Sequence, residues 1–84
     1  MRGDEPSAAT IARFQAERQA NIQRAQQEIA AARQDAQAAQ QRVDDALRCG
    51  NLTAAQRARS TKGLAEDRAR RAQAELRHWQ AVRY

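Results

Sequence analysis

The sequence contains little of what usually stabilises a small independent domain. Its 84 residues include one cysteine, one proline, three glycines and three aromatic residues. A single cysteine can form neither an internal disulfide nor a tetrahedral metal site, which excludes a disulfide framework. The chain also lacks a run of about eighteen apolar residues, and its first residues do not resemble a signal peptide. We therefore expect a cytoplasmic protein without a membrane segment; export by a signal-less route is the alternative.

Large apolar side chains are scarce as well. The apolar fraction is 42%, but alanine supplies more than half of it. Alanine, glutamine and arginine all have high helix propensity, and few glycines or prolines interrupt them. A chain with so few large side chains cannot bury a thick core. We therefore expect one domain made of long helices whose stability depends on a partner.

Local signals divide the chain into two helices. Ser7 follows Pro6 and suits the N-cap of a first helix, and Gly50 suits the left-handed position after its end. Thr53 and Gln56 match a capping box at the start of a second helix. The predicted elements are a disordered lead over 1–6 and a helical hairpin over 7–84, with helices over about 7–48 and 53–83 and a turn over 49–52.

Apolar residues recur at coiled-coil spacing in both helices, and a short turn makes the helices antiparallel. Facing positions then have numbers that add to about 101. This register pairs Ile22 with Trp79, Ala25 with Leu76, Ile29 with Ala72, Ala36 with Ala65 and Val43 with Ala58. The predicted fold is all-α, a two-helix antiparallel coiled-coil hairpin with an alanine-rich seam. Because this seam buries little area, we expect the hairpin to assemble into a four-helix bundle or to dock on a partner.

Flanking residues test the register. It places side by side Asp35 and Arg68, Arg33 and Glu66, Glu28 and Glu75, Leu47 and Leu52, and Lys62 and Ala39. The first two pairs are complementary, and the two leucines are expected to close the turn. Two features count against the register: the adjacent carboxylates of Glu28 and Glu75, and the charge of Lys62 in the seam.

Catalytic chemistry finds no support in the residue pattern. A cysteine nucleophile needs a base within hydrogen-bond reach, but His78 lies about 40 Å from the turn that holds Cys49. Cys49 is a tolerated turn residue, the site of an intermolecular disulfide, or a residue with an incidental redox role. Asp44 and Asp45 are adjacent, so their side chains point about 100° apart on a helix. We expect no enzymatic activity, no cofactor, no metal and no small-molecule substrate.

The open end of the hairpin is the first candidate interface. The register leaves about ten residues of the first helix beyond the end of the second helix, and it gathers all three aromatic residues there. These side chains either form a small core of the hairpin itself or contact a second copy or a larger protein. The candidate interface residues are Ile11, Phe14, Ile22, Leu76, Trp79, Val82 and Tyr84.

A basic stripe on the second helix is the second candidate. Residues 1–48 balance seven arginines against seven acids, whereas residues 49–84 carry eight basic residues and three acids. The outward arginines are Arg57, Arg70, Arg71 and Arg77. A line of guanidinium groups suits nucleic-acid phosphates, but it also suits an acidic protein or simply keeps a long helix solvated. The leading hypothesis is a non-enzymatic helical-hairpin protein–protein interaction module, a homodimer or the accessory of a larger protein; a small nucleic-acid-binding regulator is the alternative.

Overall fold

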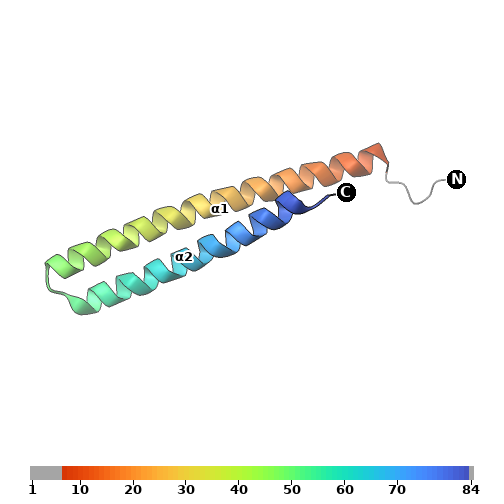
Figure 1. The fold of residues 1–84 in the computed structure, drawn as a ribbon. Coiled ribbons are helices and arrows are strands. Elements are labelled where there is room, and N and C mark those ends of the chain that lie inside the picture. The colour runs from red at the N-terminus through yellow and green to blue at the C-terminus, as the bar shows by residue number, and fades with distance from the viewer. Residues whose placement is uncertain (1–6, 84) are drawn as a thin grey trace.

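Two long helices make up the described part of the chain. The computed structural model describes residues 7–83, in which α1 spans Ala8–Arg48 and α2 spans Leu52–Ala81. The helices lie side by side and antiparallel, and α1 extends beyond the end of α2 (Figure 1). The molecule measures 74 × 14 × 13 Å. Residues 7–83 contain no strand, so the predicted all-α hairpin is confirmed. The predicted lead over 1–6 lies outside the described residues.

Side chains and backbone groups close α1 at both ends. The Ser7 hydroxyl accepts a hydrogen bond from the Thr10 amide at 3.1 Å, as an N-cap does. At the other end Gly50 adopts a φ of 73°, which glycine reaches without a Cβ penalty. The amides of Gly50 and Asn51 donate to the carbonyls of Leu47 and Ala46, at 3.1 and 2.8 Å. This pairing is a Schellman motif, which satisfies carbonyls at the helix end.

The second helix begins differently from the prediction. Asn51 is the N-cap, and its Oδ1 accepts from the Ala54 amide at 3.1 Å. Thr53 is therefore inside α2 rather than at its cap, and the capping box predicted there is wrong. Asn51 completes the cap of α1 and starts α2 at the same time, so only residues 49–51 separate the helices. Asparagine is among the best N-cap residues, which explains why the helix starts at the earlier position.

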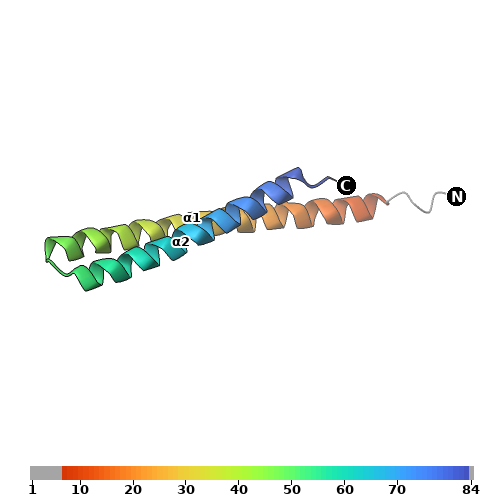
Figure 2. The same cartoon turned by 60° about the horizontal axis from the view of Figure 1, so that its bottom comes forward.

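The core is a single seam between the helices. In α1 the larger buried side chains are Ile22, Ile29 and Val43, whereas all buried residues of α2 are alanine. The helices cross gently as they follow this seam (Figure 2). Of the ten buried apolar residues seven are alanine, namely Ala25, Ala32, Ala39, Ala55, Ala58, Ala65 and Ala72. The alanine-rich seam allows close approach of the helices but buries little apolar area.

Polar contacts confirm the register in two places. Arg68 forms an ion pair with Asp35 at 2.8 Å, as predicted. The ammonium group of Lys62, which interrupts the seam, donates to Oε1 of Gln40 at 2.7 Å. This hydrogen bond supplies a polar partner for a half-buried lysine.

Two expected flanking contacts are not present. Leu47 and Leu52 remain 44% and 67% exposed, so they do not close the turn as a buried pair. Both leucines lie at the rim of the seam beside the Schellman turn, where a two-helix structure has no third layer to cover them. Within the described residues Arg33 and Glu66 form no ion pair, and both are exposed. Neither helix of the described chain has a segment long and apolar enough to cross a membrane.

Candidate functional site

The apolar residues predicted for the open end are all buried or half-buried where the structure describes them. Ile22 is buried there with 8% of its surface exposed. The other described members are half-buried, namely Ile11, Phe14, Leu76, Trp79 and Val82. The Trp79 indole meets the His78 ring edge-on, with centroids 5.3 Å apart. Tyr84 lies outside the described residues.

An arginine that the sequence analysis did not single out holds this end together. Arg18 of α1 donates from Nε to the Trp79 carbonyl at 2.8 Å, and from its terminal Nη2 to the Gln80 carbonyl at 2.9 Å. The last carbonyls of a helix have no intrahelical donor and carry the negative end of the dipole. A guanidinium group donates hydrogen bonds to these carbonyls, and its positive charge interacts favourably with the negative end of the dipole. The signal in the sequence was a charged residue at a seam position, opposite the point where α2 ends.

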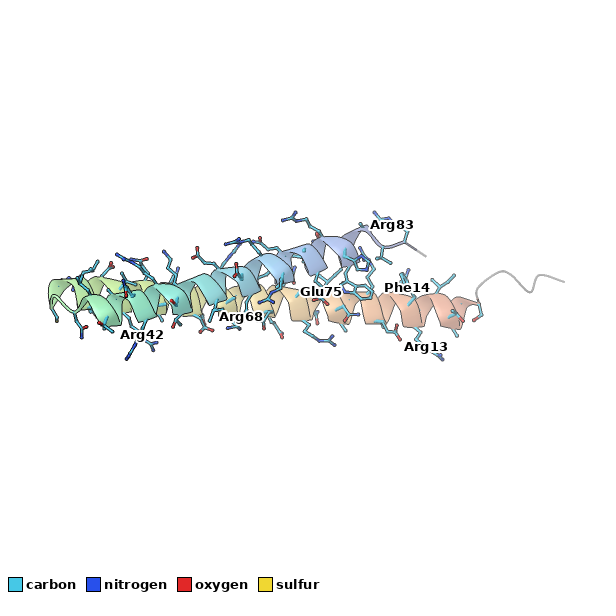
Figure 3. The ribbon with its side chains drawn as sticks, turned by 90° about the horizontal axis from the view of Figure 1, so that it is seen from below. Arg13, Phe14, Arg42, Arg68, Glu75 and Arg83 are labelled. Atoms are coloured by element: carbon cyan, nitrogen blue, oxygen red, sulfur yellow. The ribbon has the colours of Figure 1, made fainter. Side chains whose placement is uncertain are left out.

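One side of the hairpin carries a row of shallow grooves, which we call the groove face. Near the open end, a groove of about 260 Å³ lies between Glu28 and Glu75. A second groove of about 340 Å³ contains the 66%-exposed Leu64, and a third of about 440 Å³ lies beside the turn. Arg68 lines the first two, and Arg42 lines the last two. Figure 3 shows Arg42, Arg68 and Glu75 following one another along the hairpin from the turn toward the open end.

The floor of the groove face is made of alanine, two residues in each groove. They are Ala25 and Ala72 in the first groove, Ala38 and Ala65 in the second, and Ala54 and Ala58 in the third. Methyl groups fill little of the space between flanking arginines and acids. A shallow channel therefore runs along this side of both helices.

Arg68 is the centre of the charge network on the groove face. Its guanidinium contacts Glu28 and Asp35, each at 2.8 Å. Hydrogen bonds to the Glu28 carboxylate, and then to the Asp35 carboxylate, raise the pKa of Arg68 above its usual value. The adjacent carboxylates of Glu28 and Glu75, which counted against the register, thus lie in a groove that three arginines also line.

The predicted basic stripe lies only partly in the three grooves. Arg57 and Arg71 line the groove face. Arg70 pairs with Asp67 at 3.5 Å, its side chain is 73% exposed, and it lines a further shallow groove together with Leu64 and Arg71. Arg77 is exposed outside the grooves described above. The four guanidinium groups therefore do not form one isolated cationic line.

The turn end places Cys49 far from His78. Cys49 is exposed, and His78 lies 26 positions beyond Leu52 in α2, or about 39 Å along the helix. Among residues 7–83 no group of three or more His, Cys, Asp or Glu side chains is placed to hold a metal ion.

The described chain is a small antiparallel helical hairpin. Its charged residues and its half-buried apolar residues lie on the surface. Comparison with protein-family models, with curated proteins and with solved structures found no match to this chain.

Proposed function

We propose that this chain is a non-enzymatic helical-hairpin module that works by binding protein, as an assembly element, adaptor or inhibitor of a larger partner. The observation that carries the proposal is the composition of the seam, in which seven of ten buried apolar residues are alanine. Full burial of a large aliphatic side chain contributes about 1.5–3 kcal/mol, and an alanine methyl group contributes much less. A hairpin with three larger buried side chains gains substantially when another protein covers it.

The open end is one contact surface of this module. Leu76, Trp79 and Val82 on α2 keep part of their apolar surface exposed, and α1 continues beyond them with Ile11. The Arg18 bonds fix the last turn of α2, which presents these side chains on an ordered backbone. Partly buried aromatic and aliphatic anchors on a rigid element are typical of the centre of protein interfaces.

Light-scattering mass, measured across protein concentration with and without added nucleic acid, tests this proposal. We expect the chain to associate without nucleic acid, so its thermal midpoint should rise with protein concentration. Ile11→Ala should weaken that rise. Leu47→Ala removes a comparable aliphatic group at the opposite end of the hairpin and is the matched control. A monomer that changes mass only when RNA or DNA is added would contradict the proposal.

Nucleic-acid binding is the second candidate, because the whole net charge of +5 comes from residues 49–84. A duplex or single strand would release counterions on binding this half, which makes affinity fall steeply with salt. Reversing Arg70 and Arg71 to Glu should then abolish binding, while Ile11→Ala should leave it unchanged. Nucleic-acid binding that is weak at low salt, or that survives the reversal of both Arg70 and Arg71, would contradict this second function.

A further inference from the structure

We propose that a second copy of this chain packs on the groove face, reversed end for end, with α1 against α1 and α2 against α2. This inference rests on the proposed function, since it names the partner for one side of a protein-binding hairpin. The alanine floor admits side chains from a facing helix. Leu64, with 66% of its surface exposed, supplies an apolar contact near the middle of the same face.

Charge is distributed unequally along the groove face. The groove near the open end is lined by the carboxylates of Glu28 and Glu75 together with Arg24, Arg68 and Arg71, and Glu28 is paired with Arg68 at 2.8 Å. The groove beside the turn is lined by Arg42 and Arg57, and its lining within the described residues contains no carboxylate. One end of the face therefore offers acceptors for the donors at its other end. A second copy turned end for end presents the reversed pattern, so its arginines face these carboxylates and its carboxylates face these arginines.

The orientation of the second copy follows from the same charges. In a parallel arrangement α1 faces the α2 of the other copy, which brings Glu28 to Glu75 and Arg42 to Arg57. Like charges across an interface are unfavourable. In the reversed arrangement Glu28 faces Arg42 of the second copy, and Glu75 faces Arg57 of the second copy. Two-fold symmetry repeats each pair, so four attractive contacts replace four repulsive ones.

The Glu28–Arg42 contacts between the α1 helices and the Glu75–Arg57 contacts between the α2 helices require the same symmetry axis. The midpoint between Glu28 and Arg42 is position 35, and the midpoint between Arg57 and Glu75 is position 66. Positions 35 and 66 face each other in the hairpin, because their numbers add to the register sum of about 101. A single two-fold axis therefore satisfies both pairs without a shift of either helix.

The centre of this arrangement is compatible with close packing. The axis places the two copies of Leu64 about four residues apart, or ~6 Å along the hairpin, so they cover one another. It also brings the two Asp35 carboxylates together. Each of them is paired with Arg68 of its own chain at 2.8 Å, which offsets their repulsion.

The face is large enough for a stable dimer. The overlap of two copies about position 35 covers roughly 32 residues of length, or ~48 Å. With a width of 14 Å, the projected contact is on the order of 700 Å² per copy, close to the ~800 Å² that each partner buries in a standard interface. The overlap ends near position 19 of α1, so Ile11 and Phe14 lie beyond the partner's turn and only this part of the open end stays available.

Charge reversal at Arg57 and Glu75 tests the inference, because these residues are 18 positions apart on one helix, or about 27 Å, and cannot meet within one copy. Arg57→Glu and Glu75→Arg should each raise the dimer dissociation constant on the order of ten-fold or more, by placing like charges together. An equimolar mixture of the two variants restores every attractive pair and should regain the mass of twice the 9.4 kDa chain. Arg77→Glu makes the same charge change outside the grooves and is the control that should leave the dimer intact.

Sedimentation velocity over a range of concentrations gives the masses, and circular dichroism verifies that each variant remains helical. Dimers that persist equally in both single variants would overturn the groove-face inference, although the protein-binding function would stand. A mixture that stays as weakly associated as the separate variants would overturn the inference in the same way. A wild-type monomer whose mass changes only with nucleic acid would overturn both.

Discussion

The cap that Arg18 places on α2 leads to a quantitative prediction. Arg18→Met keeps a long unbranched side chain of similar helix propensity, but it removes both hydrogen bonds to the carbonyls of Trp79 and Gln80. A hydrogen bond to a charged group contributes about 1.5–3 kcal/mol when it is buried, and a cation at a helix C-terminus contributes about 0.3–1 kcal/mol. Because this site is only partly buried, we expect a combined loss of about 1–2 kcal/mol. In a chain of this size that loss lowers the melting temperature by about 5–15 °C.

Two measurements separate the cap from a general effect of losing a charge. Thermal unfolding by circular dichroism gives the overall loss of stability. Arg13→Met is the control, since Arg13 is exposed and lies on the part of α1 that extends beyond α2 (Figure 3). Fluorescence of Trp79, the sole tryptophan, reports the last turn of α2 directly. In Arg18→Met the emission maximum of Trp79 should shift to longer wavelength at temperatures below the main unfolding transition. Equal melting temperatures for the two variants, with unchanged emission, would refute the cap.

Three further predictions concern the turn, the middle of α2 and the ion network. Gly50→Ala should destabilise the hairpin by about 1 kcal/mol in chemical denaturation, because its φ of 73° disfavours a Cβ although nothing lies within 4 Å of it; Gly63→Ala, also with open space, should stabilise by up to about 1 kcal/mol. Asn51→Ala should lower the free energy of unfolding by about 1 kcal/mol, whereas Thr53→Ala should change it by less than about 0.5 kcal/mol; equal losses would argue against Asn51 as the cap. Arg68→Met should cause a small loss of stability at low salt that disappears in high salt, since its ion pairs are exposed; a loss unaffected by salt would contradict this account.

Much of the fold was predictable because it depends on periodicity. The spacing of small apolar residues in both halves predicted the seam, and Gly50 predicted the end of the first helix. The register followed from these two features, and the Arg68–Asp35 ion pair confirms it. These signals are local or repeat many times, so single exceptions such as Lys62 do not obscure them.

The contacts that were missed depend on single residues acting at helix ends. Asn51 and Thr53 are both good N-cap residues, and only the geometry of the preceding cap selects Asn51. Arg18 lies one turn before Ile22 along the seam, and its role is visible only once the end of α2 is known to lie beside it. Propensity and pattern do not encode such choices, because they depend on which backbone groups remain unpaired after the helices have formed.

The surfaces were predicted less well than the fold. A helical-wheel position separates inward from outward residues, but it does not distinguish a groove from a convex side. Arg57 and Arg71 were therefore grouped with Arg70 and Arg77, although each lines a groove that also includes residues of α1. The groove face needs the paired geometry of both helices, because each of its three grooves is lined by residues from α1 and α2.

Asn51 takes part in the cap that ends α1 and is also the N-cap of α2. The number of residues in the turn is therefore fixed. One inserted residue would rotate α2 by about 100° relative to α1, and the alanine stripe would then face solvent while arginine and glutamine side chains entered the seam. A substitution on either outer face alters one contact, but a single-codon insertion between 49 and 51 alters all of them together. We therefore expect homologous chains to vary on the outer faces of the helices while keeping the spacing of this turn unchanged.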